Sequence, residues 1–505
     1  MHRLALLCFT LVTFVPIVHS QTPDASRPHV GLVLSGGSAR GLAHIGAIHV
    51  LEAKGYAPDL IAGTSMGAVV GGLYATGWGP QSLDSLARTI DWGRAFSDAS
   101  QRSDQLLPQR LGRAPAALRV GLGEGGALPL AVLSGQRVRS LITRLTWSAR
   151  TTDDFSNLPI PFAAIAADLE TGEAIRFGEG VPLAGAIHAS LALPVIFEPV
   201  RLDGRLLVDG GVVRNLPAQD ARAMGADVLI CVDVGDDLWP ADSLHSVTDI
   251  VLQTATIGTM ASDEVQRALC DVLIRPDLDG LGADAFEQVD SLIAQGARAT
   301  TDVLDQLTTL LTPSSPPSPI NRTPPNADEA VAVCRVAFEG LERIPQPLAR
   351  RHIGLPSSTD SITVTPDLAA RWTSQLYGTG AFTNVSYALD DDDRCPSLTF
   401  TVAERSRAVV GIAGRFDSER RGAALLWARL PSLPLVSHNA QADVRLRLGR
   451  DVAARAALNG PLGVSAILMW EASLTYEEGP AFALPSGVAD DPARLRAEAV
   501  FADLH

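Results

Sequence analysis

A serine, Ser65, has the surroundings that a reactive hydroxyl needs. It lies between Gly63 and Gly67 in the sequence GTSMG, after a predicted strand at residues 59–64 and before a predicted helix at residues 66–75. A serine on such a sharp strand-to-helix turn has its hydroxyl lifted above the sheet, and small neighbours let the chain pass closely. The N-terminus of the following helix favours negative charge beside it. The pattern therefore predicts a serine nucleophile.

A second turn, rich in glycine, could stabilise the charge that acyl transfer creates. Gly36, Gly37 and Ser38 follow a predicted strand at residues 29–35 and precede a predicted helix at residues 42–54. Acyl transfer produces an oxyanion that needs prearranged N–H donors, and bare backbone amides at a helix N-terminus supply them. The alternative is a nucleotide phosphate loop, but the segment lacks the G-x-G-x-x-G spacing and the Lys-Ser/Thr ending of that loop.

A third turn offers a base. Asp209 ends the apolar segment LVD and is followed by Gly210 and Gly211. An isolated Asp-Gly pair more often marks only a turn, so the assignment depends on the two other turns that accompany it. An unperturbed aspartate is a weak base with a pKa of about 3.9. Asp209 must therefore be buried, or hydrogen-bonded to the serine, to accept a proton usefully.

Histidine offers an alternative base. His44 and His49 lie on the first predicted helix, His188 lies further along, and His245 is the next histidine after Asp209. Any of them could complete a Ser-His-Asp triad. In the α/β-hydrolase order, however, the histidine comes last, and His245 lies in no recognisable motif. A serine esterase with a histidine-containing triad therefore stays open as the alternative to a Ser–Asp pair.

Three further charged residues are predicted to be structural. Asp168 and Asp233 are other carboxylates at the ends of predicted strands. Arg40 follows the glycine-rich turn, where it could hold the loop by an ion pair or cap a surface. We favour a supporting role for it.

The elements that must position these turns alternate between strands and helices over residues 28–311. Buried strands are also predicted at residues 162–167 and 227–234. This βαβ rhythm predicts an α/β fold, a mostly parallel sheet with helices on both faces. Residues 312–326 hold six prolines, which predicts an extended linker and a domain boundary. The segment 95–150 is expected to form much of a pocket lid.

Two smaller regions are predicted beyond the linker. Residues 327–405 carry expected strands and a helix in the order of a small α+β module, with strands at residues 331–338, 382–389 and 398–402 and a helix at residues 366–377.

The last region, residues 406–505, changes to an alternating pattern. Val444, Leu446 and Leu448 alternate with arginines, which predicts antiparallel strands with one apolar face. A soluble sandwich and the start of a membrane barrel both give this pattern. The region has room for roughly five to eight barrel strands of about 9–11 residues, so an incomplete barrel is one of the alternatives.

The N-terminus and the charge balance bear on location and partners. Residues 1–20 combine a positive start, an apolar run at residues 4–18 and a small-residue cleavage site, which predicts a signal peptide. A membrane anchor is the alternative, but the run is shorter than the roughly 20 residues of a bilayer span. A net charge of −15 argues against nucleic acid as a partner, because a phosphate backbone needs a basic surface. Contact with lipid would have to be apolar and local.

Four blocks, taken together, resemble those of patatin-like phospholipases. They are GGSARG after Ser35, GTSMG around Ser65, ASLALP with FEP within residues 189–199, and DGG from Asp209. The resemblance implies a three-layer α/β/α fold with a mostly parallel sheet. The first glycine of the family's usual triplet is a serine here, which leaves the following glycine pair intact.

The same resemblance implies a mechanism. Ser65 would be the nucleophile and Asp209 its base, without a histidine, and Gly36, Gly37 and Ser38 would form the oxyanion hole. The implied activity is hydrolysis of lipid acyl esters, of the phospholipase A or lysophospholipase type, through a covalent acyl-enzyme. It needs no metal and no other cofactor. The expected partners are a phospholipid or other acyl-ester lipid and a membrane, while a homo-oligomer is left open.

Residues 327–405 resemble a POTRA module, in which the segment GAFTNV at residues 380–385 matches the turn from helix to strand. A signal peptide, a patatin-like domain, a POTRA-like module and alternating strands together resemble outer-membrane proteins of type V secretion. This implies an enzyme in the outer membrane or at the cell surface, with a periplasmic or secreted enzyme as the alternative. An outer-membrane assembly or secretion factor, with the POTRA-like module primary, is a competing hypothesis, but it needs neither GTSMG nor DGG.

Four cysteines remain after the predicted signal peptide, too few for a disulfide scaffold. Cys231 lies in an apolar run at residues 228–234 and is predicted to be a core residue. In the POTRA arrangement Cys334 and Cys395 would fall on neighbouring strands, where they would either pair or remain isolated thiols.

Overall fold

The structure is a computed structural model, in which the predicted signal peptide and His245 lie outside the described residues. The described residues are 27–98, 118–122, 131–235, 238–244, 247–313, 324, 326–355, 361–390, 395–405, 408–417, 421–430, 441–449, 452–462, 468–478 and 493–503.

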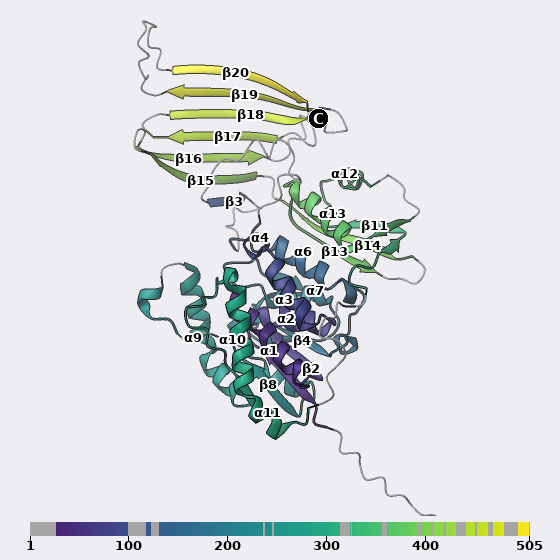
Figure 1. Ribbon diagram of the computed structural model, residues 1–505. Helices are drawn as coiled ribbons and strands as arrows, with labels where there is room; N and C mark the ends of the chain where they lie inside the picture. The colour runs from purple at the N-terminus through teal and green to yellow at the C-terminus, as the bar shows by residue number, and fades with distance from the viewer. Residues whose placement is uncertain are drawn as a thin grey trace, which may run out of the picture.

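A mainly parallel sheet forms the centre of the α/β domain (Figure 1). Its order is β6-β7-β4-β2-β1-β8-β9, and β5 pairs with β4. The pairs β4-β2, β2-β1, β1-β8 and β8-β9 are parallel, whereas β5, β6 and β7 join as antiparallel strands. The bounds are β1 Val30–Leu34, β2 Leu60–Thr64, β4 Phe162–Asp168, β5 Ala174–Phe177, β6 Val200–Leu202, β7 Arg205–Asp209, β8 Val228–Val232 and β9 Val272–Ile274.

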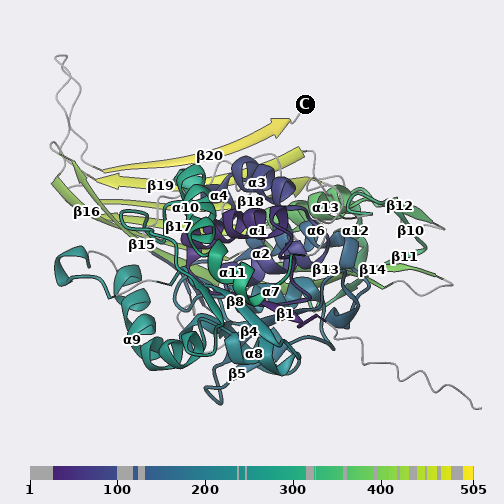
Figure 2. The same ribbon diagram turned by 60° about the horizontal axis from the view of Figure 1, so that its bottom comes forward.

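Helices cover both faces of this sheet, because its central strands are apolar on both sides. In β1, Leu32 and Leu34 pack into the core cluster that includes α1 and α2, whereas Val33 packs into the cluster that includes α8. Figure 2 shows α1 and α8 on opposite sides of the sheet. The helices are α1 Ala43–Ala53, α2 Met66–Ala75, α3 Pro80–Thr89, α4 Trp92–Ala95, α6 Gln136–Leu145, α7 Leu183–Ser190, α8 Ala218–Ala223, α9 Val247–Arg267, α10 Val289–Asp302 and α11 Leu304–Leu310. This arrangement confirms the predicted α/β/α layers.

Short 3-10 helices mark several of the turns: η1 Ser38–Leu42, η2 Trp147–Ala149, η3 Phe155–Asn157, η4 Gly210–Val212, η5 Ala241–Ser243 and η6 Phe286–Gln288. Across the described ranges, none of the helices combines the length and the apolar composition that a bilayer crossing requires.

A small α+β module follows. Its strands are β10 Val331–Val333, β11 Arg335–Glu339, β12 Ile362–Val364, β13 Phe382–Asp390 and β14 Ser397–Glu404, and its helices are α12 Gln346–His352 and α13 Pro366–Gly378. The predicted strand at residues 331–338 is in fact two strands that separate at Cys334. β10 pairs with β12, whereas β11 pairs in parallel with β14, and β13 lies at the edge of that second sheet.

The C-terminal strands form one antiparallel sheet (Figure 1). They are β15 Ala408–Asp417, β16 Arg421–Leu430, β17 Gln441–Leu448, β18 Val452–Leu462, β19 Leu468–Glu478 and β20 Ala493–Asp503. β3, Leu118–Leu122, pairs antiparallel with β15 although it precedes α6 in the chain. The predicted alternation is present, since Leu446 is exposed on one face while Arg429 and Asp443 form an ion pair.

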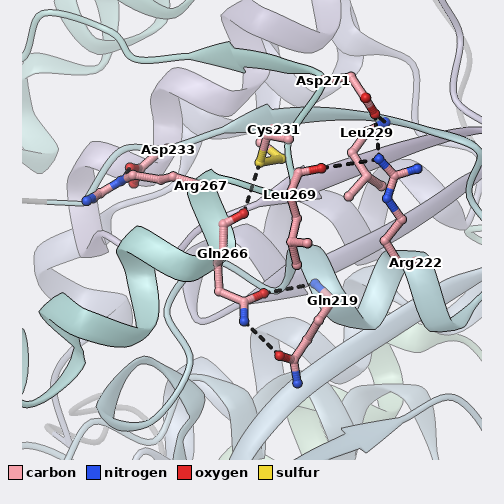
Figure 3. Close-up of a disulfide and its surroundings, with 10 residues drawn as sticks. Gln219, Arg222, Leu229, Cys231, Asp233, Gln266, Arg267, Leu269 and Asp271 are labelled. Atoms are coloured by element: carbon pink, nitrogen blue, oxygen red, sulfur yellow. Dashed lines mark hydrogen bonds and ion pairs between the residues drawn. A yellow bond between two sulfur atoms is a disulfide. The ribbon is translucent and has the colours of Figure 1, made fainter.

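Two disulfides tie elements together. Cys231 of β8 bonds to Cys270 after α9, and Cys334 bonds to Cys395. Cys231 is buried in the core, as predicted, but its disulfide was not foreseen, because Cys270 lies far along the chain and only the fold brings it near. Figure 3 shows this disulfide beside two polar contacts that fix the same helix end: the Gln219 N–H donates to Gln266 Oε1 (2.9 Å), and Arg267 pairs with Asp233 (2.6 Å).

Candidate active site

Ser65 occupies the turn between β2 and α2 in a backbone conformation that side chains rarely adopt. Its φ is 54° and its ψ is −124°. Such strain persists only where the surroundings enforce it, and it is typical of functional positions. A Cβ atom on Gly67 would collide with the Leu34 carbonyl oxygen, and one on Gly63 would collide with the Gly67 carbonyl group. The two glycines therefore allow the turn to pack directly against the end of β1.

Asp209, the last residue of β7, accepts a hydrogen bond from the hydroxyl of Ser65. Ser65 Oγ donates to Asp209 Oδ2 at 2.6 Å, and the Gly211 N–H donates to Asp209 Oδ1 at 2.7 Å. β7 pairs with β4, which pairs with β2, so the sheet itself brings the two turns together. A side chain on Gly210 would collide with the Ile165 carbonyl oxygen, so only glycine allows the Asp209 turn to approach β4.

Burial makes Asp209 a stronger base than a free aspartate. Its side chain is 3% exposed, and among the described residues no arginine or lysine forms an ion pair with it. Removal from water raises the pKa of Asp209 to about 6, against the opposing effect of the hydrogen bonds from Ser65 and Gly211. A carboxylate with this pKa is still ionised at neutral pH and accepts a proton more readily than an ordinary aspartate.

Ser190, to which sequence reasoning assigned no role, holds the nucleophile turn from behind. The Ser65 N–H donates to Ser190 Oγ (2.8 Å), and the Ser190 hydroxyl donates to the Ile165 carbonyl oxygen of β4 (2.5 Å). Ser190 is fully buried at the end of α7. Its place in the segment ASLALP was the available signal, but only the fold shows that it ties Ser65 to the neighbouring strand.

The glycine-rich turn differs from the prediction at Gly36. The Gly36 N–H donates to the Asn215 carbonyl oxygen (3.2 Å), and Asn215 Nδ2 donates back to the Gly36 carbonyl oxygen (3.3 Å). Gly36 is thus a structural member of the turn and not a free oxyanion donor, and Asn215 is a supporting residue that sequence reasoning missed. Gly37 and Ser38 make no hydrogen bond through their N–H groups to any described residue, so these are the two amides left for the predicted oxyanion hole.

Arg40 supports this turn from inside. Its backbone N–H donates to the Gly37 carbonyl oxygen (3.0 Å), and its side chain is buried in η1. Capping of an exposed surface, one of the two roles weighed for it, does not fit this burial.

The histidines of the described chain do not contact the pair. His44 Nε2 bonds to the Ser35 carbonyl oxygen (2.8 Å), and burial lowers the pKa of His44 to about 4. Burial also holds the pKa of His188 well below its usual range. His49 lies on α1, part-way exposed. None of these three hydrogen-bonds to Ser65 or Asp209, whereas His245 lies outside the described residues.

The other strand-end carboxylates bind cations. Asp168 Oδ2 accepts from Arg205 at 2.9 Å, and Asp233 Oδ2 accepts from Arg267 at 2.6 Å. The described residues hold no cluster of three or more His, Cys, Asp or Glu side chains suited to a metal ion.

An apolar cavity of about 40 Å³ lies directly behind the turns of the site. Leu42, Met66 and Leu191 line it, and each follows one of the turns that hold Gly37, Ser65 or Ser190. The opposite wall comes from α3, α4 and α6, including Phe96 and Ile142. Parts of the predicted lid segment, residues 95–150, therefore line the cavity, while residues 99–117 and 123–130 lie outside the described ones.

Residues 32–222 match the family model of patatin-like phospholipases. The chain contains a patatin-like phospholipase domain. The match includes the three turns that carry Gly37, Ser65 and Asp209, so the site lies entirely within the patatin-like domain.

Curated relatives share the same part of the chain. An uncharacterised NTE family protein of Mycobacterium bovis is 35% identical over 246 residues, which cover 48% of this chain and 60% of the relative. A patatin-like phospholipase domain-containing protein of Caenorhabditis elegans is 33% identical over 254 residues, which cover 48% of this chain and 17% of the relative. The alignment with the mycobacterial relative thus spans about 60% of that protein's length.

Among solved structures, VipD from Legionella pneumophila aligns with 55% of this chain and 67% of its own at 16% identity. Its TM-score of 0.30 is too low to support an inference about the present chain.

Proposed function

We propose that the chain is a serine lipid acyl hydrolase in which Ser65 is the nucleophile and Asp209 is its base. The 2.6 Å hydrogen bond from Ser65 Oγ to the buried Asp209 Oδ2 carries this proposal. The patatin-like domain supports it, because the family model is one of phospholipases. The substrate class is a phospholipid or lysophospholipid acyl ester, and the apolar cavity beside Met66 suits an alkyl chain.

In the acylation step, Ser65 Oγ attacks the ester carbonyl carbon while its proton passes to Asp209 Oδ2. The carbonyl oxygen becomes an oxyanion, for which the Gly37 and Ser38 N–H groups are the donors. The N-terminus of α2 adds the favourable end of a helix dipole beside Ser65. When the tetrahedral intermediate collapses, Asp209 returns the proton to the leaving alcohol oxygen, and the acyl group stays on Ser65.

In the deacylation step, Asp209 takes a proton from a water molecule that attacks the acyl carbon. The second tetrahedral intermediate releases the fatty acid, and Ser65 Oγ regains its proton from Asp209. One carboxylate can serve both steps because it acts as a base and then as an acid in each. The raised pKa of Asp209, about 6, suits both roles near neutral pH.

We also propose that the protein is exported and works at the outer membrane, with the C-terminal sheet in contact with lipid. The apolar side chains Ile412, Val444 and Leu446 are exposed on this sheet, which an aqueous surface disfavours. Arg429 lies on the other face of this sheet, where it pairs with Asp443. The predicted signal peptide and the POTRA-like order of the α+β module agree with this location. Retention in the outer-membrane fraction after a high-salt wash tests it, and release by salt alone would contradict it.

Activity-based labelling tests the proposed reaction. We expect a fluorophosphonate to modify the intact protein on the peptide that contains Ser65, as located by mass spectrometry. In a separate assay, we expect the unlabelled protein to release free fatty acid from phospholipid vesicles. Ser65→Ala should abolish both signals. Ser85→Ala, on the exposed side of α3, is the matched control and should behave as wild type. Labelling of Ser65→Ala at the wild-type level would refute the proposal.

A further inference from the structure

Helix α6 lines the apolar cavity with one face and contacts the α+β module with the opposite face. Val138, Leu141, Ile142 and Leu145 follow the helical period and line the apolar cavity behind the nucleophile turn. Gln136 lies on the opposite face, toward the α+β module. Figure 1 shows α6 on the side of the patatin-like domain that faces the module. Contacts between the module and α6 therefore hold one wall of the cavity in position.

The edge strand of the module's sheet forms hydrogen bonds with the outer face of α6, and we call these contacts the module's grip on α6. Gln136 Nε2 donates to the Val385 carbonyl oxygen (2.6 Å), and the Val385 N–H donates to Gln136 Oε1 (2.8 Å). The side-chain amide thereby satisfies both backbone groups of Val385 on β13, as a neighbouring strand would. Both residues are buried, so these hydrogen bonds do not compete with water.

Neighbouring contacts reinforce this grip. Arg139 Nη1 donates to Asn384 Oδ1 at 2.6 Å, one residue from the Gln136 contact. Just beyond α6, Trp147 is part of the module's own hydrophobic core, and its Nε1 donates to the Glu329 carbonyl oxygen (3.0 Å). The helix is thus fixed to the module from its first turn to the residues after its last turn.

The cavity is too narrow for a long alkyl chain while α6 stays in this position. Its volume of about 40 Å³ is about a quarter of that of a cavity that holds one benzene ring, about 150 Å³. Its lining is apolar throughout, so an alkyl chain is the chemistry that it accepts. A longer chain requires a wall to move outward, and α6 is the wall whose outer side is gripped by the module.

We propose that the α+β module sets the acyl-chain length that the enzyme accepts, with Gln136 as the positioning residue that transmits its grip to the cavity. This inference rests on the proposed hydrolase function and names the determinant of its chain-length specificity. Loosening the grip frees α6 to move, which favours longer acyl chains relative to short ones.

The test compares hydrolysis of p-nitrophenyl dodecanoate and butyrate by the full-length protein. The measured quantity is the ratio of kcat/KM for the long ester to that for the short one. We expect Gln136→Ala to raise this ratio by about tenfold, the scale of one or two methylenes in an apolar pocket. Asn384→Ala, which alters only the module side, should raise it by a smaller factor. Ile142→Ala, which enlarges the cavity directly, should raise it as well.

The matched control is Asp367→Ala, which removes the exposed ion pair with Arg144 at the same interface (3.2 Å). An exposed pair contributes little, so the ratio should stay within about twofold of wild type. An unchanged ratio in Gln136→Ala and Asn384→Ala, with Ile142→Ala shifted, would overturn the role of the module. An unchanged ratio in all variants would overturn the cavity as the acyl site.

Two measurements distinguish these outcomes from misfolding of a variant and from failure of the proposed hydrolase function. Fluorophosphonate labelling at Ser65 shows that a variant still has a folded site, and Asn384→Ala tests the grip without altering the cavity helix. Failure of the proposed function itself would look different, since wild-type protein would then neither hydrolyse the esters nor be labelled at Ser65.

Discussion

Two turns of the same sheet, those that follow β7 and β8, carry buried aspartates in similar local settings. Asp209 accepts the N–H of Gly211 (2.7 Å), and Asp233 accepts the N–H of Gly235 (3.0 Å). Each aspartate ends or directly follows an apolar strand, and each is buried. From local sequence alone, the two are difficult to tell apart.

The two aspartates differ in the partner of the second carboxylate oxygen, Oδ2. Asp233 Oδ2 accepts from Arg267, with Arg275 3.8 Å away, and the adjacent disulfide ties the same helix end to β8 (Figure 3). Asp209 Oδ2 faces Ser65. A paired carboxylate has its charge neutralised and joins elements, whereas an unpaired buried one gains basicity. The partner of the second oxygen, more than the turn, therefore decides whether such an aspartate supports structure or catalysis.

Exchange of each aspartate for asparagine should give the largest contrast in activity. We expect Asp209→Asn to lower kcat/KM for an ester by about 10³-fold or more, because general-base assistance contributes about 10²–10⁴-fold. Asp233→Asn should lower it by no more than about fivefold, since that carboxylate does not contact Ser65. Steady-state hydrolysis by folded variants measures both values. Equal losses would show that the two turns do not differ in function.

The stability of the same variants should show the opposite order. Asp233→Asn leaves Arg267 without its 2.6 Å partner and should lower the free energy of unfolding by about 2 kcal/mol. Chemical denaturation at neutral pH, with the disulfides intact, measures this loss. An unchanged midpoint would mean that the Asp233 pair does not stabilise the end of β8.

Asp209→Asn should instead stabilise the fold at high pH. The folded pKa of Asp209 is raised from 3.8 to about 6, so protonated Asp209 stabilises the protein below about pH 4, and this contribution is lost as pH rises through about 6. Asparagine never ionises, and we expect the variant to gain about 1–2 kcal/mol over wild type at pH 8. No gain should remain at pH 4. A variant that is less stable than wild type at pH 8 would contradict burial as the cause of the raised pKa.

The smallest effect is expected at His44. It lies behind the glycine-rich turn and bonds to the Ser35 carbonyl oxygen, not to the catalytic pair. His44→Gln should reduce kcat/KM by less than about tenfold through movement of that turn, and the pH at half-maximal activity should not change. A pH profile that lost its ascending limb would make His44 the base and would remove the distinction between the two aspartate turns.

Local pattern predicted the elements that carry the site. The apolar runs before Ser65 and Asp209 are strands, and the glycines beside them are required by close packing of backbone. Alternation in the last region also predicted its antiparallel strands, because period-two side chains report directly on a strand.

Long-range pairs could not be predicted in this way. The use of the Gly36 N–H by Asn215, the support of Ser65 by Ser190 and the Cys231–Cys270 bond all depend on how distant segments pack. The pairing of β3 with β15 is of the same kind. Neither hydrophobic period nor turn chemistry contains information about such partners, which only the three-dimensional arrangement supplies.

The central claim is that Asp209 activates Ser65, and the most direct test is the rate of fluorophosphonate labelling of Ser65 as a function of pH. This rate reports on activation of the nucleophile without depending on the natural substrate. We predict that the wild-type rate falls as pH drops through about 6, where Asp209 becomes protonated. In Asp209→Asn the rate should be at least about 10²-fold slower and independent of pH across this range. Labelling of Asp209→Asn at the wild-type rate and with the wild-type pH profile would contradict it.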